Sequence, residues 1–242
     1  MPQRMSRRVA VLVIGIVCTL AGPLQGQVLI GYLFGEKLAS ENFNMGFEIG
    51  VNFATLDGMG DAERARKTVF GLFADWRFSE HLHFGGALLP FAGRGASGLD
   101  PVPTGDSGID GQTAGGTMSR NLSYLEVPLM LRWAPKKQTG FRAGVGTSLG
   151  LVTGAHDRYE ATTAAGTPYT LERDIEDELG SFDFGVSAEI EWRFPMLSIA
   201  ARYTHGLTDL DQGTDAEMRT RTLTGTGRIY LGKKTAPKPA TK

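Results

Sequence analysis

Cysteine is almost absent from this sequence. Cys18 is the only one among 242 residues, and it lies in an apolar run near the N-terminus. If that run is removed on export, no thiol remains, which excludes disulfides, thiol catalysis and cysteine-based metal sites. The 25 lysines and arginines do not exceed the 26 aspartates and glutamates, so nucleic acid is not an expected partner. No later stretch is apolar enough for a membrane-spanning helix, which needs roughly 20 residues.

The N-terminus has the pattern of a secretory signal. Arg4, Arg7 and Arg8 precede the apolar residues 9–21, and small or turn-forming residues follow. The apolar run is too short to cross a bilayer, so a cleaved signal peptide over residues 1–26 is favoured over a retained anchor. Its removal leaves 22 basic and 26 acidic residues, a formal charge of −4. We therefore expect an exported chain, either a soluble β protein or a membrane barrel.

The segment 180–194, GSFDFGVSAEIEWRF, alternates between two very different faces. One face, from Phe182 to Phe194, is wholly apolar, and the other, from Asp183 to Arg193, is mainly polar or charged. Neighbouring side chains of a strand point to opposite sides of a sheet. Large charges on one face and apolar residues on the other indicate a barrel whose apolar face contacts lipid.

Eight segments of this kind predict an all-β fold, an eight-stranded antiparallel transmembrane barrel over residues 44–232. Each is near or above the 9–11 residues that a tilted strand needs to cross a bilayer. The spacers after the second, fourth and sixth segments are short, and the others are long and polar. This predicts short periplasmic turns and long extracellular loops. The predicted strands are 44–56, 68–79, 82–92, 121–134, 139–153, 181–194, 196–206 and 219–231.

Aromatic residues cluster just before the short turns. All three tryptophans of the chain lie there, at the same depth of the expected barrel. Amphipathic rings favour the headgroup level of a membrane, so these residues predict a girdle at the periplasmic interface. The predicted girdle consists of Trp76, Phe78, Trp133, Trp192 and Phe194.

Alternation also predicts which charges lie inside. An eight-stranded barrel is just wide enough for side chains to fill it, and buried charges must be paired. A balanced set therefore predicts a plugged, structural interior and argues against a channel, a catalytic pocket or a soluble ligand-carrying barrel. The predicted interior charges are Glu48, Asp75, Arg77, Glu126, Arg132, Arg142, Asp183, Glu189, Glu191, Arg193, Arg202 and Arg228.

Two segments flank the barrel. Residues 27–43 mix apolar residues with a short helical pattern, which predicts a periplasmic or interfacial segment that packs at the barrel mouth. Residues 233–242, KKTAPKPATK, are basic and contain proline, which predicts a disordered tail.

Three stretches resemble the PorT-type outer-membrane barrels, known chiefly from Bacteroidetes: VLIGYLFGEKLASENFNMGFEIGVNF, NLSYLEVPLMLRW and FRAGVGTSLGLV. The most specific part is Ser123–Leu129, SYLEVPL, in which Pro128 predicts a bulge or kink because proline cannot donate to the strand ladder. The resemblance implies an eight-stranded outer-membrane barrel without catalytic residues. The founding member of this family is linked to type IX protein secretion. The resemblance therefore implies an accessory role in secretion as one alternative.

Evidence for chemistry is weak. A lipid-modifying enzyme, the second alternative, would need a nucleophile, a base and an acid near the rim, and His205 with Thr204 and Asp209 is the best candidate. His81 and His83 are too few ligands to predict a metal site. The acidic outer loops could bridge divalent cations to lipopolysaccharide, but their spacing does not match a calcium loop.

The sequence therefore predicts a structural or interaction protein of a Gram-negative outer membrane rather than an enzyme. No catalytic residue, cofactor or metal site is predicted. The expected partners are outer-membrane lipid and lipopolysaccharide, and envelope or secretion-system proteins.

Overall fold

The computed structural model describes residues 42–59, 62–102, 107–113, 115–135, 139–162, 166–211 and 217–231. The predictions for the signal peptide, for residues 27–41 and for the C-terminal tail lie outside these ranges. No helix within the described ranges is long and apolar enough to cross a membrane.

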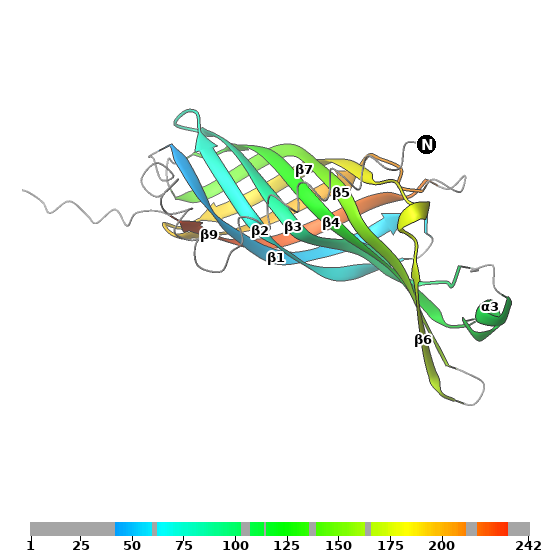
Figure 1. Ribbon diagram of the computed structural model, residues 1–242. Helices are drawn as coiled ribbons and strands as arrows, with labels where there is room; N and C mark the ends of the chain where they lie inside the picture. The colour runs from blue at the N-terminus through cyan, green and yellow to red at the C-terminus, as the bar shows by residue number, and fades with distance from the viewer. Residues whose placement is uncertain are drawn as a thin grey trace, which may run out of the picture. The chain divides into compact units, whose positions relative to one another are not determined.

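The described chain consists of nine strands, one short α-helix and one 3-10 turn (Figure 1). Every strand pairing is antiparallel. The elements are β1 Phe43–Asp57, β2 Glu63–Arg77, β3 Leu82–Leu99, α3 Ser107–Thr113, β4 Thr117–Trp133, β5 Gly140–Thr162, β6 Pro168–Asp174, η1 Glu176–Glu178, β7 Phe182–Arg193, β8 Leu197–Gly206 and β9 Arg219–Leu231.

Eight of the strands close into a ring. Consecutive strands pair with one another from β1 to β5, β5 then pairs with β7, and β9 pairs back with β1. Closure satisfies the backbone hydrogen bonds of every ring strand and leaves no sheet edge in the ring. β6 stands outside the ring, because it pairs with the far end of β5, from His156 to Thr162.

All eight predicted strands are present, and several are longer than predicted. β3 continues to Leu99, and β5 continues to Thr162, where it forms a hairpin with β6. The hairpin was not predicted, because its residues are polar and lack the apolar face that marks the ring strands. The connection between β1 and β2 is also shorter than predicted. It has only residues 58–62, because Ala54 pairs with Ala65 and both strands extend toward the turn.

The connections at the two ends of the ring differ. At one end, which we call the turn end, β2–β3, β4–β5 and β7–β8 are joined by residues 78–81, 134–139 and 194–196. At the other, the loop end, residues 100–116 carry α3, the β5–β7 connection carries β6 and η1, and residues 207–218 join β8 to β9. The eight-membered ring brings the first and last described strands, β1 and β9, together as neighbours.

Pro128 causes no break in the β4–β5 ladder, whereas the β3–β4 ladder has no pair at Val127 or Pro128. It pairs with Ser148 within a continuous stretch of the β4–β5 ladder. The register shifts instead lie closer to the loop end, between Ser123 and Tyr124 on the β5 side and between Leu89 and Ala92 on the β3 side. Proline has no N–H to donate, and at this position β4 keeps its regular register with β5 while its pairing with β3 is interrupted.

The interior of the ring changes character along its length. Toward the loop end it is apolar, with buried side chains such as Leu56, Leu99, Met118, Leu122 and Tyr159 in one cluster. Further toward the turn end the buried side chains are largely arginines and carboxylates. The sequence analysis did not predict this apolar cluster at the loop end, which we call the apolar cap.

Candidate functional site

Strand β7 shows how the charges reach the interior. Along Phe182–Arg193, polar residues and Gly185 are buried, and the apolar residues between them are partly or largely exposed. Phe182, Ile190 and Trp192 are about half exposed, whereas Glu189 and Glu191 are buried. The strict period of two therefore turns a whole row of charges inward, as the sequence predicted for this strand.

Glu189 lies at the centre of the interior charges. Arg228 of β9 binds it with two nitrogens, Nη2 to Oε2 at 2.7 Å and Nη1 to Oε1 at 3.1 Å. Arg132 of β4 donates from Nε to Oε1 at 2.6 Å. Arg228 also donates from Nε to Glu48 of β1 at 2.7 Å. One continuous set of charge-assisted hydrogen bonds thus connects four strands across the ring.

Asp75 of β2 is surrounded by cationic groups at the turn end. Arg142 Nη1 lies 3.0 Å from its Oδ2, and Arg193 Nη1 lies 3.6 Å from the same oxygen. Arg132 Nη1 lies 3.4 Å from Oδ1, and His83 Nδ1 lies 3.4 Å from Oδ2. The guanidinium of Arg193 also covers the ring of Tyr230 at 3.8 Å from its centroid, an arrangement that favours a cation.

A separate group of charges lies closer to the loop end. Arg94 of β3 reaches across the ring to Asp183 of β7, with Nη1 2.7 Å from Oδ2, and its Nη2 lies 3.0 Å from Glu126 Oε2. Ser148 donates to Glu126 at 2.7 Å, and Thr220 donates to Asp183 at 2.9 Å. Ser148 thus binds the Glu126 oxygen that Arg94 does not reach, whereas Thr220 and Arg94 share the same oxygen of Asp183.

The apolar cap holds one further ion pair, Arg120 with Asp157. Nε and Nη2 of Arg120 donate to the two carboxylate oxygens at 2.7 and 2.6 Å. The thioether sulfur of Met218 lies 3.5 Å from Arg120 Nη1. This pair fixes β4 to β5 where the two strands leave the ring.

Two glycines leave room for the arginine side chains. A Cβ atom on Gly85 would lie 2.0 Å from Nη1 of Arg132, and one on Gly144 would lie 2.9 Å from its Cγ. Arg132 therefore passes between two positions of β3 and β5 that have no side chain.

Every residue of the predicted interior set except Arg77 is buried and makes a hydrogen bond or ion pair with an interior group. Arg77 is the exception, because it ends β2 at the mouth of the ring and donates to the side chain of Asn42 instead. Sequence reasoning missed Arg94, Arg120, Asp157 and His83. Arg94 and Arg120 lie in or beside a glycine-rich stretch whose sequence predicts a loop. His83 alternates with the exposed Leu82 and Phe84, so the alternation could have predicted that it is buried.

The four histidines have different surroundings. His81 lies in a turn, where its Nδ1 is 3.0 Å from the carbonyl oxygen of Ala134, while His83 is buried beside Asp75. The Asp209 carboxylate accepts from the backbone amides of Asp211 and Met218 and makes no hydrogen bond with His205 within the described chain. No group of three potential metal ligands occurs among the described residues.

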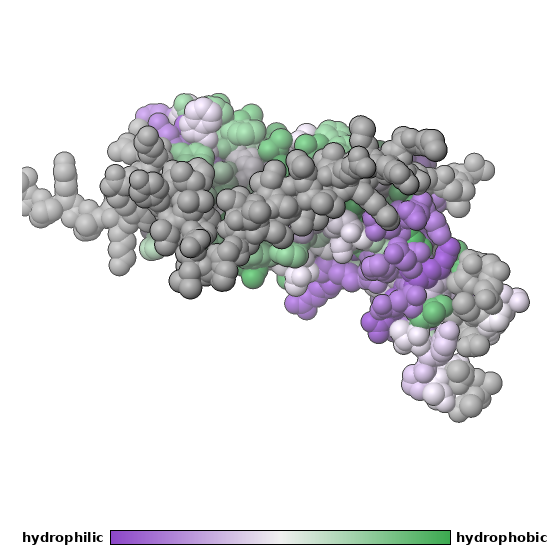
Figure 2. Space-filling model, viewed as in Figure 1, coloured by the Kyte–Doolittle hydropathy of each residue, from purple (hydrophilic) through white to green (hydrophobic). Residues whose placement is uncertain are grey.

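The outer surface of the ring is apolar over much of its area. Figure 2 shows hydrophobic residues along the ring strands and hydrophilic residues where β5 and β6 extend beyond it. The residues proposed for the aromatic girdle are all exposed, and Trp76, Trp133 and Trp192 are each about half exposed, at 52, 51 and 50%. They lie at the turn ends of β2, β4 and β7, and Trp76 contacts Phe78 with ring centroids 4.7 Å apart.

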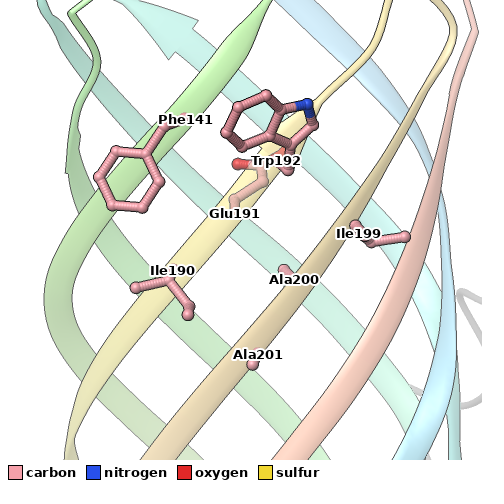
Figure 3. A pocket seen from close by; sticks show the side chains of 7 residues that line it. All are labelled: Phe141, Ile190, Glu191, Trp192, Ile199, Ala200 and Ala201. Carbon is pink, nitrogen blue, oxygen red and sulfur yellow. The ribbon is translucent and has the colours of Figure 1, made fainter.

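One hollow of about 300 Å³ opens on this outer surface. Phe141, Ile190, Trp192 and Ile199 surround the small side chains of Ala200 and Ala201 (Figure 3). The lining is apolar apart from Glu191, which is buried and makes ion pairs with arginines inside the ring.

Comparison with known proteins identifies the family. Residues 34–212 match the outer membrane protein beta-barrel domain. The chain belongs to this outer-membrane β-barrel family. No curated protein matches the sequence.

Among solved structures, the barrel is similar to Ail, the attachment invasion locus protein of Yersinia pestis, solved with the heparin analogue sucrose octasulfate. That match has 12% identity and a TM-score of 0.41, and covers 78% of this chain and 99% of Ail. Neisserial surface protein A matches with 12% identity and a TM-score of 0.38, covering 79% of this chain and 98% of its own. The N-terminal barrel domain of Pseudomonas aeruginosa OprF matches with 11% identity and a TM-score of 0.30, covering 78% of this chain and 98% of its own.

Proposed function

We propose that this protein is a membrane-spanning barrel of the Gram-negative outer membrane that conducts no solutes. It anchors a polar loop end, which binds outer-membrane lipid, lipopolysaccharide or other envelope proteins. The observation that carries the proposal is the division of β7 into a buried charged row and an exposed apolar row. A water-soluble barrel would place these two rows the other way round.

The outer apolar surface supports insertion in a membrane. Exposed apolar side chains occur on all eight ring strands, for example Ile49, Phe91, Val145 and Ile229. A soluble monomer rarely exposes a continuous apolar patch of more than a few hundred Å². Together with the tryptophans at one level near the turn end, this surface matches the apolar band and aromatic girdle of outer-membrane barrels.

The interior supports a plugged barrel. Long arginine side chains reach across the ring from β3, β4 and β9 and bind carboxylates on β1, β2 and β7. An eight-stranded barrel has room for little besides its own side chains. The apolar cap then closes the loop end above these charges.

The hairpin of β5 and β6 supports binding at the loop end. Arg158, Glu160 and Glu172 are exposed there, and Arg158 Nε lies 2.8 Å from Glu160 Oε1. Because the hairpin stands outside the ring, its charged surface is available to a partner without opening the barrel. Catalysis is not part of the proposal, since neither His205 nor the outer hollow is placed with a nucleophile and a base.

Within the family, we place this chain near the PorT-type barrels on the strength of the Ser123–Leu129 segment, SYLEVPL. An accessory role in protein secretion would then be visible in a deletion strain as loss of surface or secreted cargo. An anchor that binds only envelope lipid would leave secretion unchanged.

The first experiment combines membrane fractionation, heat-modifiable migration and conductance of the purified mature protein. We expect outer-membrane fractionation, a fast-migrating band before boiling, and no single-channel steps in a planar lipid bilayer. A soluble protein without a heat shift would contradict the membrane proposal. Regular conductance steps would contradict the plug while leaving the membrane proposal intact.

A further inference from the structure

The outward face of β2 changes from cationic to apolar along its length. From the loop end, its exposed side chains begin with Arg64 and Arg66, continue with Phe70, and end with Trp76 of the girdle. Ala65 lies between the two arginines and is buried, so both arginines point away from the interior. Two positive charges therefore precede the apolar part of a face that the proposed function puts against lipid.

The distance along β2 puts these arginines at a defined height. Arg66 and Trp76 are ten positions apart on the same face of the strand. Ten residues of a strand rise by about 33 Å, and a tilt of about 40° reduces this to about 25 Å across the membrane. The apolar band of an outer-membrane barrel is about 25 Å tall. With Trp76 at one boundary of the band, Arg66 lies at the other, and Arg64 lies just beyond it among the lipid head groups.

Arg66 borders an apolar row that crosses four strands. It pairs with Phe53 of β1, which in turn pairs with Leu223 of β9. Leu223 pairs with Tyr203 of β8. These three side chains are 40, 41 and 44% exposed on the outer surface. A lipid whose acyl chains cover this surface would have its head group close to the two arginines.

Arg64 and Arg66 differ from other arginines near the loop end in having no partner. Neither side chain makes an ion pair or a hydrogen bond within the part of the chain that the structure describes. Three others each bind a carboxylate: Arg158 binds Glu160 at 2.8 Å, Arg219 binds Glu217 at 2.7 Å, and Arg221 binds Asp57 at 2.5 Å. An arginine in water needs no partner. At the head-group level, the phosphates of lipopolysaccharide are available as partners.

We propose that Arg64 and Arg66 bind a phosphate group of lipid A, the membrane-embedded part of lipopolysaccharide, whose acyl chains lie on the apolar face of β1 and β2. Two positions on one face of a strand are about 7 Å apart, and each guanidinium presents parallel N–H groups that match phosphate oxygens. The inference rests on the proposed membrane location. It concerns lipid of the protein's own membrane, whereas the β5–β6 hairpin extends beyond the ring and is not part of this site.

The test measures binding of lipid A to the purified full-length mature protein, folded in a neutral detergent. Lipid A with two phosphate groups is titrated at about 0.15 M salt, where charges more than about 8 Å apart are largely screened. Native mass spectrometry measures the fraction of protein with one lipid bound. The comparison lipid has the same acyl chains and no phosphate. Heat-modifiable migration shows beforehand that each variant is folded.

We expect the wild type to bind phosphorylated lipid A at least about tenfold more tightly than the phosphate-free lipid, and Arg64→Gln/Arg66→Gln to lose this preference. Arg219→Gln/Arg221→Gln is the matched control. It also removes two arginines from alternate positions of a strand near the loop end, but both already bind carboxylates. The control should change the affinity by less than about twofold. If the double variant does not fold, Arg66→Gln alone should weaken binding at least about threefold.

Three results would overturn the proposal. One is equal affinity of the wild type for the two lipids, which would mean that only the acyl chains bind. The others are unchanged binding by the Arg64 and Arg66 variants, and an equal loss in the control, which would indicate a general effect of net charge. A soluble protein without a heat shift would contradict the membrane location itself. A heat-modifiable outer-membrane protein that fails the lipid A titration would contradict this site alone.

Discussion

Arg228 and Glu189 form a two-pronged ion pair inside the barrel, with N–O distances of 3.1 and 2.7 Å between β9 and β7. The two strands are not neighbours, because β8 lies between them. The pair therefore crosses part of the interior and does not merely reinforce a strand ladder. Both side chains are almost fully buried, so water does not screen the interaction.

Glu189→Gln should destabilise the barrel strongly. The substitution keeps the shape of the side chain but removes the charge that Arg228 and Arg132 share. Leaving buried arginines without their partner costs about 3–5 kcal/mol in comparable pairs. Urea titration of the folded band in detergent measures the free energy of unfolding.

The matched control is Glu160→Gln on the β5–β6 hairpin. Glu160 also binds an arginine, Arg158, at 2.8 Å, but both side chains are about half exposed. Exposed pairs contribute about 0–1 kcal/mol, so this variant should behave nearly as wild type. Equal losses in the free energy of unfolding would show that the interior pair stabilises the protein no more than the exposed pair does.

Gly46→Ala should destabilise β1. A Cβ atom at Gly46 would lie 1.8 Å from the carbonyl oxygen of Ile229 on β9, which backbone pairing holds in place. Overpacking of this kind costs about 1–3 kcal/mol. Gly225→Ala is the control in the facing strand, because its added Cβ would meet no atom within 4 Å. Thermal midpoints should fall for Gly46→Ala alone, and a fall of the same size in both would refute the steric explanation.

The ring strands could be predicted from the sequence because each one alternates between two environments. β7 is the clearest case, and its alternation places Glu189 and Glu191 inside without any knowledge of the neighbouring strands. The same rule puts Arg77 on the face of Asp75, but Arg77 is only partly buried. At the end of a strand, the side chain can turn toward the mouth, and Arg77 binds Asn42 there.

Other features depend on contacts that no local pattern shows. Arg94 pairs with Asp183, 89 positions away in the sequence, and the pairing exists only once the ring has closed. The β5–β6 hairpin is polar, so hydrophobic alternation does not reveal it. The separation of Arg94, Glu126 and Asp183 from the other interior charges also depends on strand register, because register decides which arginine meets which carboxylate.

The hairpin should be separable from the barrel. Glu160 and Thr170 pair directly, so residues 161–169 can be replaced by Asn-Gly, which favours a tight two-residue turn. Tyr159, which is buried in the apolar cap, is retained. The shortened protein still carries Arg158, Glu160 and Glu172, so these are changed to serine as well. This variant should keep heat-modifiable migration but lose binding to lipopolysaccharide-containing vesicles in flotation assays. Loss of the folded band would show instead that the hairpin stabilises the barrel, and unchanged binding would place the binding surface elsewhere.

Val186→Arg tests the membrane directly. Val186 is exposed on β7, six positions from Trp192 along the strand, and its outward direction follows from the buried Ser187 beside it. In a lipid bilayer, an arginine near the midplane of a barrel strand costs about 2–4 kcal/mol. On a soluble protein, the same exposed substitution would change stability by about 0.5 kcal/mol or less.

Thr170→Arg on the hairpin is the control, since it is exposed outside the ring. Folding into lipid vesicles, followed by urea titration, should therefore show a loss for Val186→Arg and none for Thr170→Arg. If both variants fold into vesicles as well as wild type, the apolar face of β7 does not contact the hydrocarbon, and a partner other than lipid must cover it.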